Sequence, residues 1–97
     1  MAYEIVWLPK AEMTFEGIIS WLQTNWTDRE ISNFVARTNV VLDMIRINPK
    51  LYRGAGKRKI REVVINKQII LLYRIKSNKV ELLTFFDTRQ NPNKKFK

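Results

Sequence analysis

The sequence predicts an α+β domain of two layers, in which a helical hairpin covers one face of a small antiparallel sheet. Two adjacent stretches in the first half show helical periodicity, and three consecutive strand-like stretches with short turns fill the second half. Helices that are grouped apart from most of the strands are typical of this class. With 97 residues, 45% of them hydrophobic, the chain can bury one core, so we expect a single domain over residues 1–97.

The first half begins with a short strand, expected at residues 3–8. Pro9 suits the first turn of a helix, which is predicted over residues 10–25. Its apolar side chains recur at helical spacing, at Phe15, Ile18, Ile19, Leu22 and Trp26. We therefore expect this side of the helix to be buried.

The segment TDRE at residues 27–30 is a capping box, because the Thr27 hydroxyl can cap the amide of Glu30. A second helix should start there and stop at Asn48-Pro49, so the two helices form an antiparallel hairpin. Its apolar stripe is predicted to contain Ile31, Phe34, Val35, Thr38, Leu42 and Ile45. Further apolar residues widen the stripe, so that much of this helix should be covered: Val40, Val41, Met44 and Ile47.

The second half reads as a glycine-containing loop (50–58) followed by strands at about 59–65, 68–76 and 80–86. Short turns between these strands predict an antiparallel meander, with Asn66 as a residue of positive φ in the first turn. The overall order is thus β-α-α-β-β-β.

Strand alternation assigns side chains to the two faces of this sheet. The helix-facing set is predicted to be Ile69, Leu71, Tyr73 and Ile75 with Val80, Leu82, Thr84 and Phe86. The opposite face would carry Ile70, Leu72, Leu83 and Phe85, flanked by Arg74 and Lys76. An apolar centre on a face that should meet solvent indicates either a partner-binding surface or a site over which the C-terminal tail folds back.

Charge is unevenly distributed along the chain. The net charge is +9, yet residues 1–45 hold three basic and six acidic groups, whereas residues 46–97 hold fifteen basic and three acidic groups. The second half should attract a polyanion or an acidic protein, unless it simply serves as a soluble basic surface.

Several classes of function are disfavoured by composition. The chain has no cysteine and no histidine, which removes thiolate metal sites and histidine-based nucleophile activation, and we expect no cofactor or metal. No stretch has the pattern of a signal peptide or the length of a membrane helix, so we expect a cytoplasmic protein. The segment GAGK at residues 54–57 lacks the remaining residues of a phosphate-binding loop.

Four cations lie close together at Lys57, Arg58, Lys59 and Arg61. If a strand begins near residue 59, Lys59 and Arg61 share one face and can bracket a phosphate or carboxylate. Without histidine or metal, a nuclease here would need these cations together with a tyrosine or a carboxylate as base, and Tyr52 is the only tyrosine in the loop. The alternative is a basic strand edge that discourages strand addition.

The order of elements and several short motifs resemble the RelE/ParE family of toxins from bacterial toxin–antitoxin modules. The matching positions are Trp7, Ala11, Asn48-Pro49, Arg61, LLYRI at 71–75 and FFDTRQNP at 85–92. The resemblance covers nearly the whole chain and implies a helical hairpin against a small sheet. It also implies neutralisation by a cognate acidic antitoxin, for which the expected contact residues are Ile70, Leu72, Leu83 and Phe85.

The family divides by activity. RelE-like members cleave mRNA on the ribosome, which would here employ Lys59, Arg61 and Arg89, with Lys57, Arg58, Arg74 and Gln90 binding RNA or target. Two positions depart from that pattern, because Ile70 stands where an arginine is expected and Phe96 where a tyrosine is expected. The resemblance therefore favours ParE-like growth inhibition through DNA gyrase; a ribosome-dependent ribonuclease and a non-toxic interaction module are the alternatives.

Overall fold

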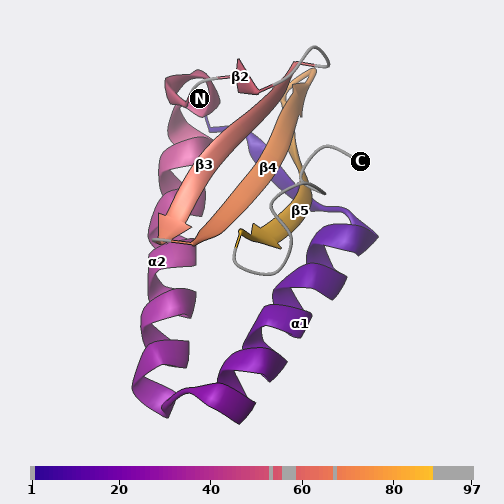
Figure 1. Cartoon of the computed structure of the whole chain (residues 1–97). Helices are drawn as coiled ribbons and strands as arrows, with labels where there is room; N and C mark the ends of the chain where they lie inside the picture. Colours follow the sequence, from indigo (N-terminus) through magenta and orange to yellow (C-terminus); the bar gives the residue numbers. More distant parts are fainter. Residues whose placement is uncertain (1, 53, 56–58, 67, 89–97) are drawn as a thin grey trace.

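The structure is a computed structural model that describes residues 2–52, 54–55, 59–66 and 68–88, with residues 54 and 55 as backbone only (Figure 1). The elements in chain order are β1 (Glu4–Trp7), α1 (Pro9–Asn25), α2 (Asp28–Ile47), the 3-10 helix η1 (Pro49–Leu51), β2 (Gly54–Ala55), β3 (Ile60–Asn66), β4 (Ile69–Lys76) and β5 (Lys79–Asp87). The predicted β-α-α-β-β-β order is confirmed, with β2 as an additional two-residue strand inside the predicted loop.

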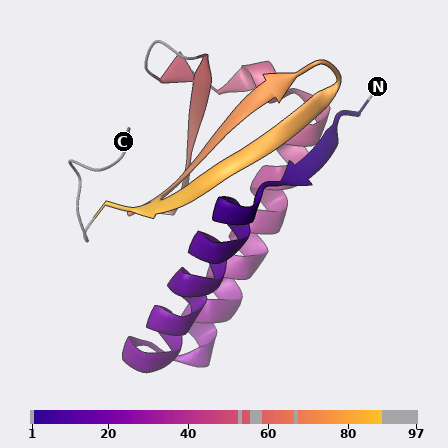
Figure 2. The same ribbon diagram turned by 90° about the vertical axis from the view of Figure 1, so that its right-hand side faces the viewer.

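The strands form one sheet in the order β1-β5-β4-β3-β2. β1 runs parallel to β5, and the other neighbours are antiparallel. Both helices lie on one face of the sheet, and the hairpin extends beyond the end of the strands (Figure 2). The predicted two-layer α+β architecture is thus confirmed.

Local signals set the bounds of the hairpin. Pro9 is the first residue of α1, and the Thr27 hydroxyl accepts a hydrogen bond from the Glu30 amide at 3.4 Å at the start of α2. The prediction that Trp26 is buried is wrong, because Trp26 is the C-cap of α1 and 47% of it is exposed.

The core side of α2 agrees with the narrower predicted stripe. Its buried residues are Phe34, Thr38, Val41, Leu42 and Ile45. The widened stripe is not covered, however, because Val40, Met44 and Ile47 are exposed and only Val41 is buried. The helix therefore has an apolar side that the rest of the described chain does not cover.

The largest departure from the predicted faces occurs in β5. Leu82 pairs with Tyr73 and Thr84 pairs with Leu72, which leaves Leu83 as an extra residue in a β-bulge. The bulge reverses the alternation beyond it, since a one-residue shift moves each following side chain to the other face. Phe85 consequently lies in the core, 2% exposed, and the prediction that it lies on the outer face is wrong.

The neighbouring helix explains why β5 bulges at this point. β1 ends at Trp7, so beyond Leu82 the ladder with β1 stops and the chain enters α1. The Thr14 hydroxyl of α1 accepts a hydrogen bond from the Phe85 amide at 2.9 Å and donates one to the Lys10 carbonyl at 2.8 Å. A buried amide without a strand partner is thereby satisfied by a side chain.

The reversal completes an aromatic cluster beneath the hairpin. The Phe85 ring lies 5.6 Å from Trp7, 5.1 Å from Phe15 and 6.5 Å from Phe34, measured between centroids. Because such contacts add to the area that each ring buries, the cluster stabilises the bulged register. Phe86 takes the place on the outer face, where it pairs with Ile70.

Asn66 shapes the β3–β4 turn in another way than predicted. Among the described residues other than glycine, positive φ occurs at Lys59 and Ser77, and not at Asn66. Instead, the Asn66 side-chain oxygen accepts hydrogen bonds from the amides of Gln68 and Ile69 at 3.3 and 3.2 Å. Asn66 thus closes the turn through its side chain.

Candidate functional site

Arg61 lies on the helix-facing side of the sheet, near its edge. It is paired with Tyr73, and directly opposite residues of neighbouring strands share a face. Tyr73 is fully buried and its hydroxyl donates to the Pro49 carbonyl at 2.6 Å, while Arg61 Nη1 donates to the Tyr52 carbonyl at 2.7 Å. Arg61 thus helps to hold the segment that follows α2 against the sheet.

The environment of Tyr73 is both apolar and cationic. Burial raises the pKa of Tyr73 from its ordinary value of 10.0 to about 12, and the Arg61 charge partly opposes this rise. Tyr73 therefore remains a neutral hydrogen-bond donor at physiological pH. Together, Tyr73 and Arg61 form a structural anchor for η1 rather than an open cationic site.

Arg74 lies on the opposite face. It follows Tyr73 directly in β4, and successive side chains of a strand point to opposite faces. Its Nε donates to a Glu81 carboxylate oxygen at 2.6 Å. Arg61 and Arg74 therefore do not converge, and each already has a partner.

The structure tests the other predicted site residues only in part. Lys59 is exposed and occupies the turn before β3, so strand alternation does not place it on the face of Arg61. Tyr52, the candidate base, contacts Met44 Sδ through its hydroxyl at 3.7 Å. Lys57, Arg58, Arg89, Gln90 and Phe96 lie outside the described residues, and their roles stay predictions.

The outer sheet face is apolar, as predicted, but its membership differs. Ile70 and Leu72 lie on it and are 9% and 3% exposed, so the expectation that its centre meets solvent is wrong for both. Leu83 is half-buried at the bulge, and Phe86 stands where Phe85 was expected. Whether these residues bind an antitoxin stays a prediction.

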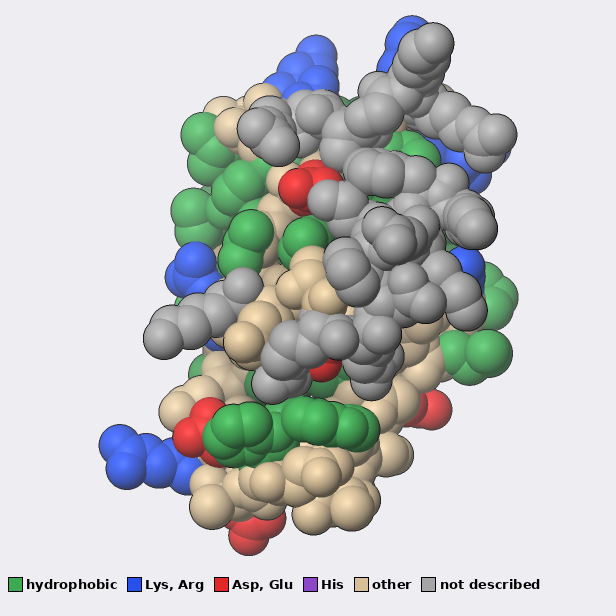
Figure 3. All heavy atoms as spheres, in the orientation of Figure 1, with side chains coloured by type: hydrophobic (Ala, Val, Ile, Leu, Met, Phe, Trp, Pro, Cys, Tyr) green, Lys and Arg blue, Asp and Glu red, His purple; other side chains and the backbone are tan. Residues whose placement is uncertain are grey.

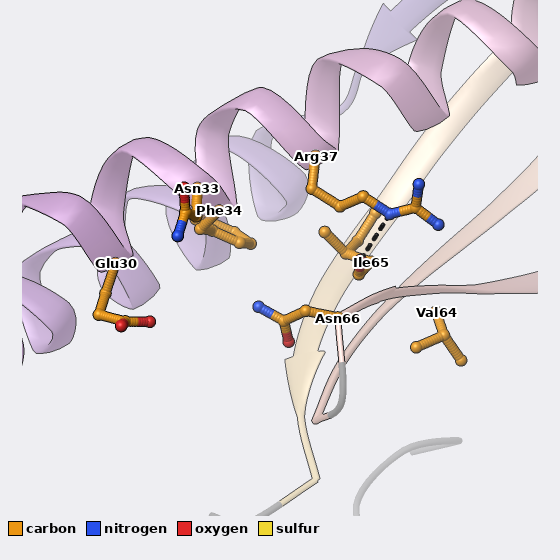
Figure 4. Close-up of a pocket in the computed structure, with 7 residues that line it drawn as sticks. All are labelled: Glu30, Asn33, Phe34, Arg37, Val64, Ile65 and Asn66. Atoms are coloured by element: carbon orange, nitrogen blue, oxygen red, sulfur yellow. Dashed lines mark hydrogen bonds between the residues drawn. The ribbon is translucent and has the colours of Figure 1, made fainter.

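A cleft between α2 and the end of β3 was not predicted (Figure 4). It has a volume of about 570 Å³ and is lined by Glu30, Asn33, Phe34, Arg37, Val64, Ile65 and Asn66. Arg37 reaches across it, and its Nε donates to the Ile65 carbonyl at 3.0 Å. The helical lining residues recur every three or four positions, but the sequence does not reveal that β3 is their neighbour.

Two further observations concern metal ions and membranes. The acidic side chains of the described segments form no group of three or more that could hold a metal ion. None of the helices within these segments is long and apolar enough to cross a membrane.

Comparison with known proteins identifies the fold. No protein-family model and no curated protein sequence matches this chain. A chain of the chromosomal ParDE TA system from P. aeruginosa superposes with a TM-score of 0.74 at 11% identity, covering 89% of this chain and 96% of that one. The fold is that of the RelE and ParE toxins. The resemblance seen in the sequence is thus confirmed at the level of fold.

Other structures with the RelE/ParE fold match over similar lengths. A chain of the toxin–antitoxin complex RelBE2 from Mycobacterium tuberculosis gives a TM-score of 0.63 at 13% identity, covering 90% of this chain and 99% of that chain. The YoeB dimer from Staphylococcus aureus gives 0.61 at 19% identity, covering 87% and 94%. The described chain therefore contains nearly all of the elements that define this toxin fold.

Proposed function

We propose that this chain is the toxin of a type II toxin–antitoxin pair, which inhibits growth by binding DNA gyrase in the cytoplasm and is neutralised by a cognate acidic antitoxin. The toxin fold and the TM-score of 0.74 with a chain of the ParDE system support this proposal. The net charge of +9 suits an acidic protein partner.

The observation that favours target binding over RNA cleavage is the separation of Arg61 from Arg74. Cleavage without histidine or metal requires preorganised cations around the phosphate on which charge develops. The two arginines lie on opposite faces, bonded to the Tyr52 carbonyl and the Glu81 carboxylate. Ile70 and Phe96 also stand where the resemblance places the arginine and tyrosine of RNA-cleaving members.

Expression of the chain without any partner, followed by assays of the purified protein, tests the proposal. We expect arrested growth, dose-dependent inhibition of gyrase supercoiling, and no new ends in primer extension on ribosome-bound mRNA. Normal supercoiling at saturating protein would contradict gyrase as the target. Unimpeded growth would contradict a toxin altogether and favour the non-toxic interaction module.

The ribonuclease alternative predicts that single arginine substitutions abolish mRNA cleavage. New mRNA ends that disappear in Arg89→Ala and in Arg74→Ala, while both variants keep the wild-type melting temperature, would establish cleavage and overturn target binding. The conservative variant Arg74→Lys serves as the matched control, because it keeps the charge but loses the planar fork of donors.

A further inference from the structure

An exposed apolar stripe runs along the C-terminal part of α2 and into η1. It consists of Val40, Met44, Ile47 and Leu51, which are 48%, 40%, 73% and 56% exposed, and we call it the α2 seam. Four of the seven large exposed hydrophobic residues in the described part of the chain belong to it, so this is a patch and not scatter. Hydrophobic side chains reach the surface over this end of α2 in Figure 3.

The spacing of the seam indicates what kind of element fits it. Within α2 its members follow one another at intervals of four and three residues, and Arg37 extends the pattern one step towards the N-terminus. Leu51 lies beyond the break at Asn48, in η1. Alternating intervals of three and four are typical of the surface that one helix presents to another. The core side of α2 holds different residues, so packing against the sheet does not explain the seam.

Hydrogen bonds hold the seam in shape at its C-terminal end. The Leu51 amide donates to the Asn48 carbonyl at 3.1 Å, and the Tyr73 hydroxyl holds the Pro49 carbonyl at 2.6 Å. Tyr52 contacts Met44 Sδ at 3.7 Å. A surface that is already ordered loses less conformational entropy when a partner binds.

The charges around the seam favour an acidic partner. Arg46 is paired with Asp43 at 3.1 Å, which leaves Arg37 and Lys50 as the neighbouring cations among the residues that the structure describes. Arg37 uses its Nε on the Ile65 carbonyl, and within the described segments it has no carboxylate at ion-pair distance. A glutamate or aspartate of a partner could therefore pair with the remaining nitrogens of Arg37.

A second copy of this chain fits the seam poorly. An antiparallel pairing of two seams would bring Arg37 close to Lys50 of the other copy, and a parallel pairing would oppose two copies of Arg37. Each chain also carries a net charge of +9, and like charges brought together oppose association. The combination of helical spacing with positive flanks is better matched by a partner of opposite charge.

We propose that the α2 seam is the docking site for an acidic amphipathic helix of a partner protein, whose apolar residues cover the seam while a carboxylate pairs with Arg37. The part of the seam within α2, from Val40 to Ile47, spans roughly 10 Å at the α-helical rise, so a helix of about three turns would cover it and extend towards η1. The inference rests on the proposed function in one respect, namely that the partner is the antitoxin.

The probe for this site is a synthetic three-heptad peptide with leucine at positions a and d and glutamate at e and g, titrated calorimetrically into the whole chain. Ile47→Glu is the test variant and Met13→Glu its matched control, because the two residues are 73% and 70% exposed on different helices and the charge change is the same. We expect wild type and Met13→Glu to bind alike, and Ile47→Glu to bind on the order of tenfold more weakly.

Two additional titrations, one with a second seam variant and one with a scrambled peptide, test the same site. Val40→Glu should weaken binding as Ile47→Glu does, and both variants should keep the wild-type melting temperature. A peptide of the same composition with its leucines scrambled out of the heptad pattern should bind more weakly, since charge attraction alone does not fill the seam.

Equal affinity of Ile47→Glu and wild type would overturn the proposal, as would equal binding of the scrambled peptide. A wild-type dimer that Ile47→Glu dissociates in sedimentation would assign the seam to a second copy. If wild type sediments with anionic phosphatidylserine vesicles and Ile47→Glu does not, the seam binds a membrane. Either of these two outcomes would overturn the proposal of a partner helix. Expression of Ile47→Glu without a partner separates the proposed toxin function from the proposed docking site. Growth arrest by this variant would support the toxin function, whereas the peptide titration alone tests whether the seam binds a helix.

Discussion

The two apolar sides of α2 differ in what covers them. Ile45 is fully buried under the sheet, while Ile47, two residues later in the same helix, is 73% exposed. The sheet can cover only one side of a helix that lies on it, so the second apolar side needs another explanation. The comparison teaches that an apolar position on a helix does not by itself mark the side that packs against the sheet.

The largest expected effect is on the buried side. Ile45→Ala should lower the free energy of unfolding by roughly 2–5 kcal/mol, because it leaves a cavity where the surrounding side chains cannot fully collapse. Chemical denaturation followed by circular dichroism measures this. A loss below about 1 kcal/mol would show that the buried side of α2 is loosely packed, and the contrast with Ile47 would weaken.

The end of α2 that bears the seam should loosen at high pH. Tyr73 has a raised pKa in the folded chain, about 12, so its stabilising contribution is complete below pH 10 and is lost as the pH rises towards 12. We expect a loss of roughly 2–3 kcal/mol over that range, when the ionised hydroxyl can no longer donate to the Pro49 carbonyl. Urea denaturation at a series of pH values measures it.

Tyr73→Phe is the control for this pH dependence. The variant should start less stable at neutral pH, by about 1–2 kcal/mol, because the buried Pro49 carbonyl loses its donor. It should then lose less stability than wild type between pH 10 and 12. Identical pH profiles of the two proteins would mean that Tyr73 is not the titrating group.

Replacing Arg61 should destabilise the fold slightly more than replacing Arg74. Arg61→Ala removes a charged donor from the Tyr52 carbonyl beside the seam and should cost about 1–2 kcal/mol. Arg74→Ala breaks a surface ion pair with Glu81 and should cost less than about 1 kcal/mol. Thermal melts of both variants test the order, and the reverse order would mean that Arg74 is the structural residue.

The smallest effect is expected on the exposed side. Ile47→Ala should change the free energy of unfolding by no more than about 0.5 kcal/mol, since the side chain has little to lose on the surface. The same variant should still reduce the affinity for the acidic probe helix. A destabilisation comparable to that of Ile45→Ala would indicate that another part of the chain covers the seam.

Much of the fold was predictable because local interactions set it. The capping hydrogen bond between Thr27 and the Glu30 amide fixes the start of α2 within three residues of sequence, and Pro9 marks the start of α1. The three main strands lie within one residue of their predicted bounds. The short β2 was missed, because two residues leave no periodic pattern.

The candidate site was predictable only in part. Strand alternation predicted that Arg74 lies on the outer face, and the structure places it there. The face of Arg61 follows from its pairing with Tyr73 on the next strand, which no local pattern indicates. The cleft at Arg37 was missed for the same reason, since its other wall belongs to β3. Three seam residues, Val40, Met44 and Ile47, were identified as apolar but were expected to be covered, and their exposure depends on where the sheet stops covering α2. Leu51 was placed in a loop and was not identified.

The sequence by itself determined the order of the elements, the bounds of the hairpin and the basic charge of the second half, because these depend on residues within about one turn or on composition. Tertiary structure decided the reversal at Leu83. There Thr14, about seventy positions away, accepts the hydrogen bond of the Phe85 amide and brings that ring into the core. Alternation within a strand is a local rule, and it fails where a distant side chain satisfies the backbone better than a neighbouring strand does.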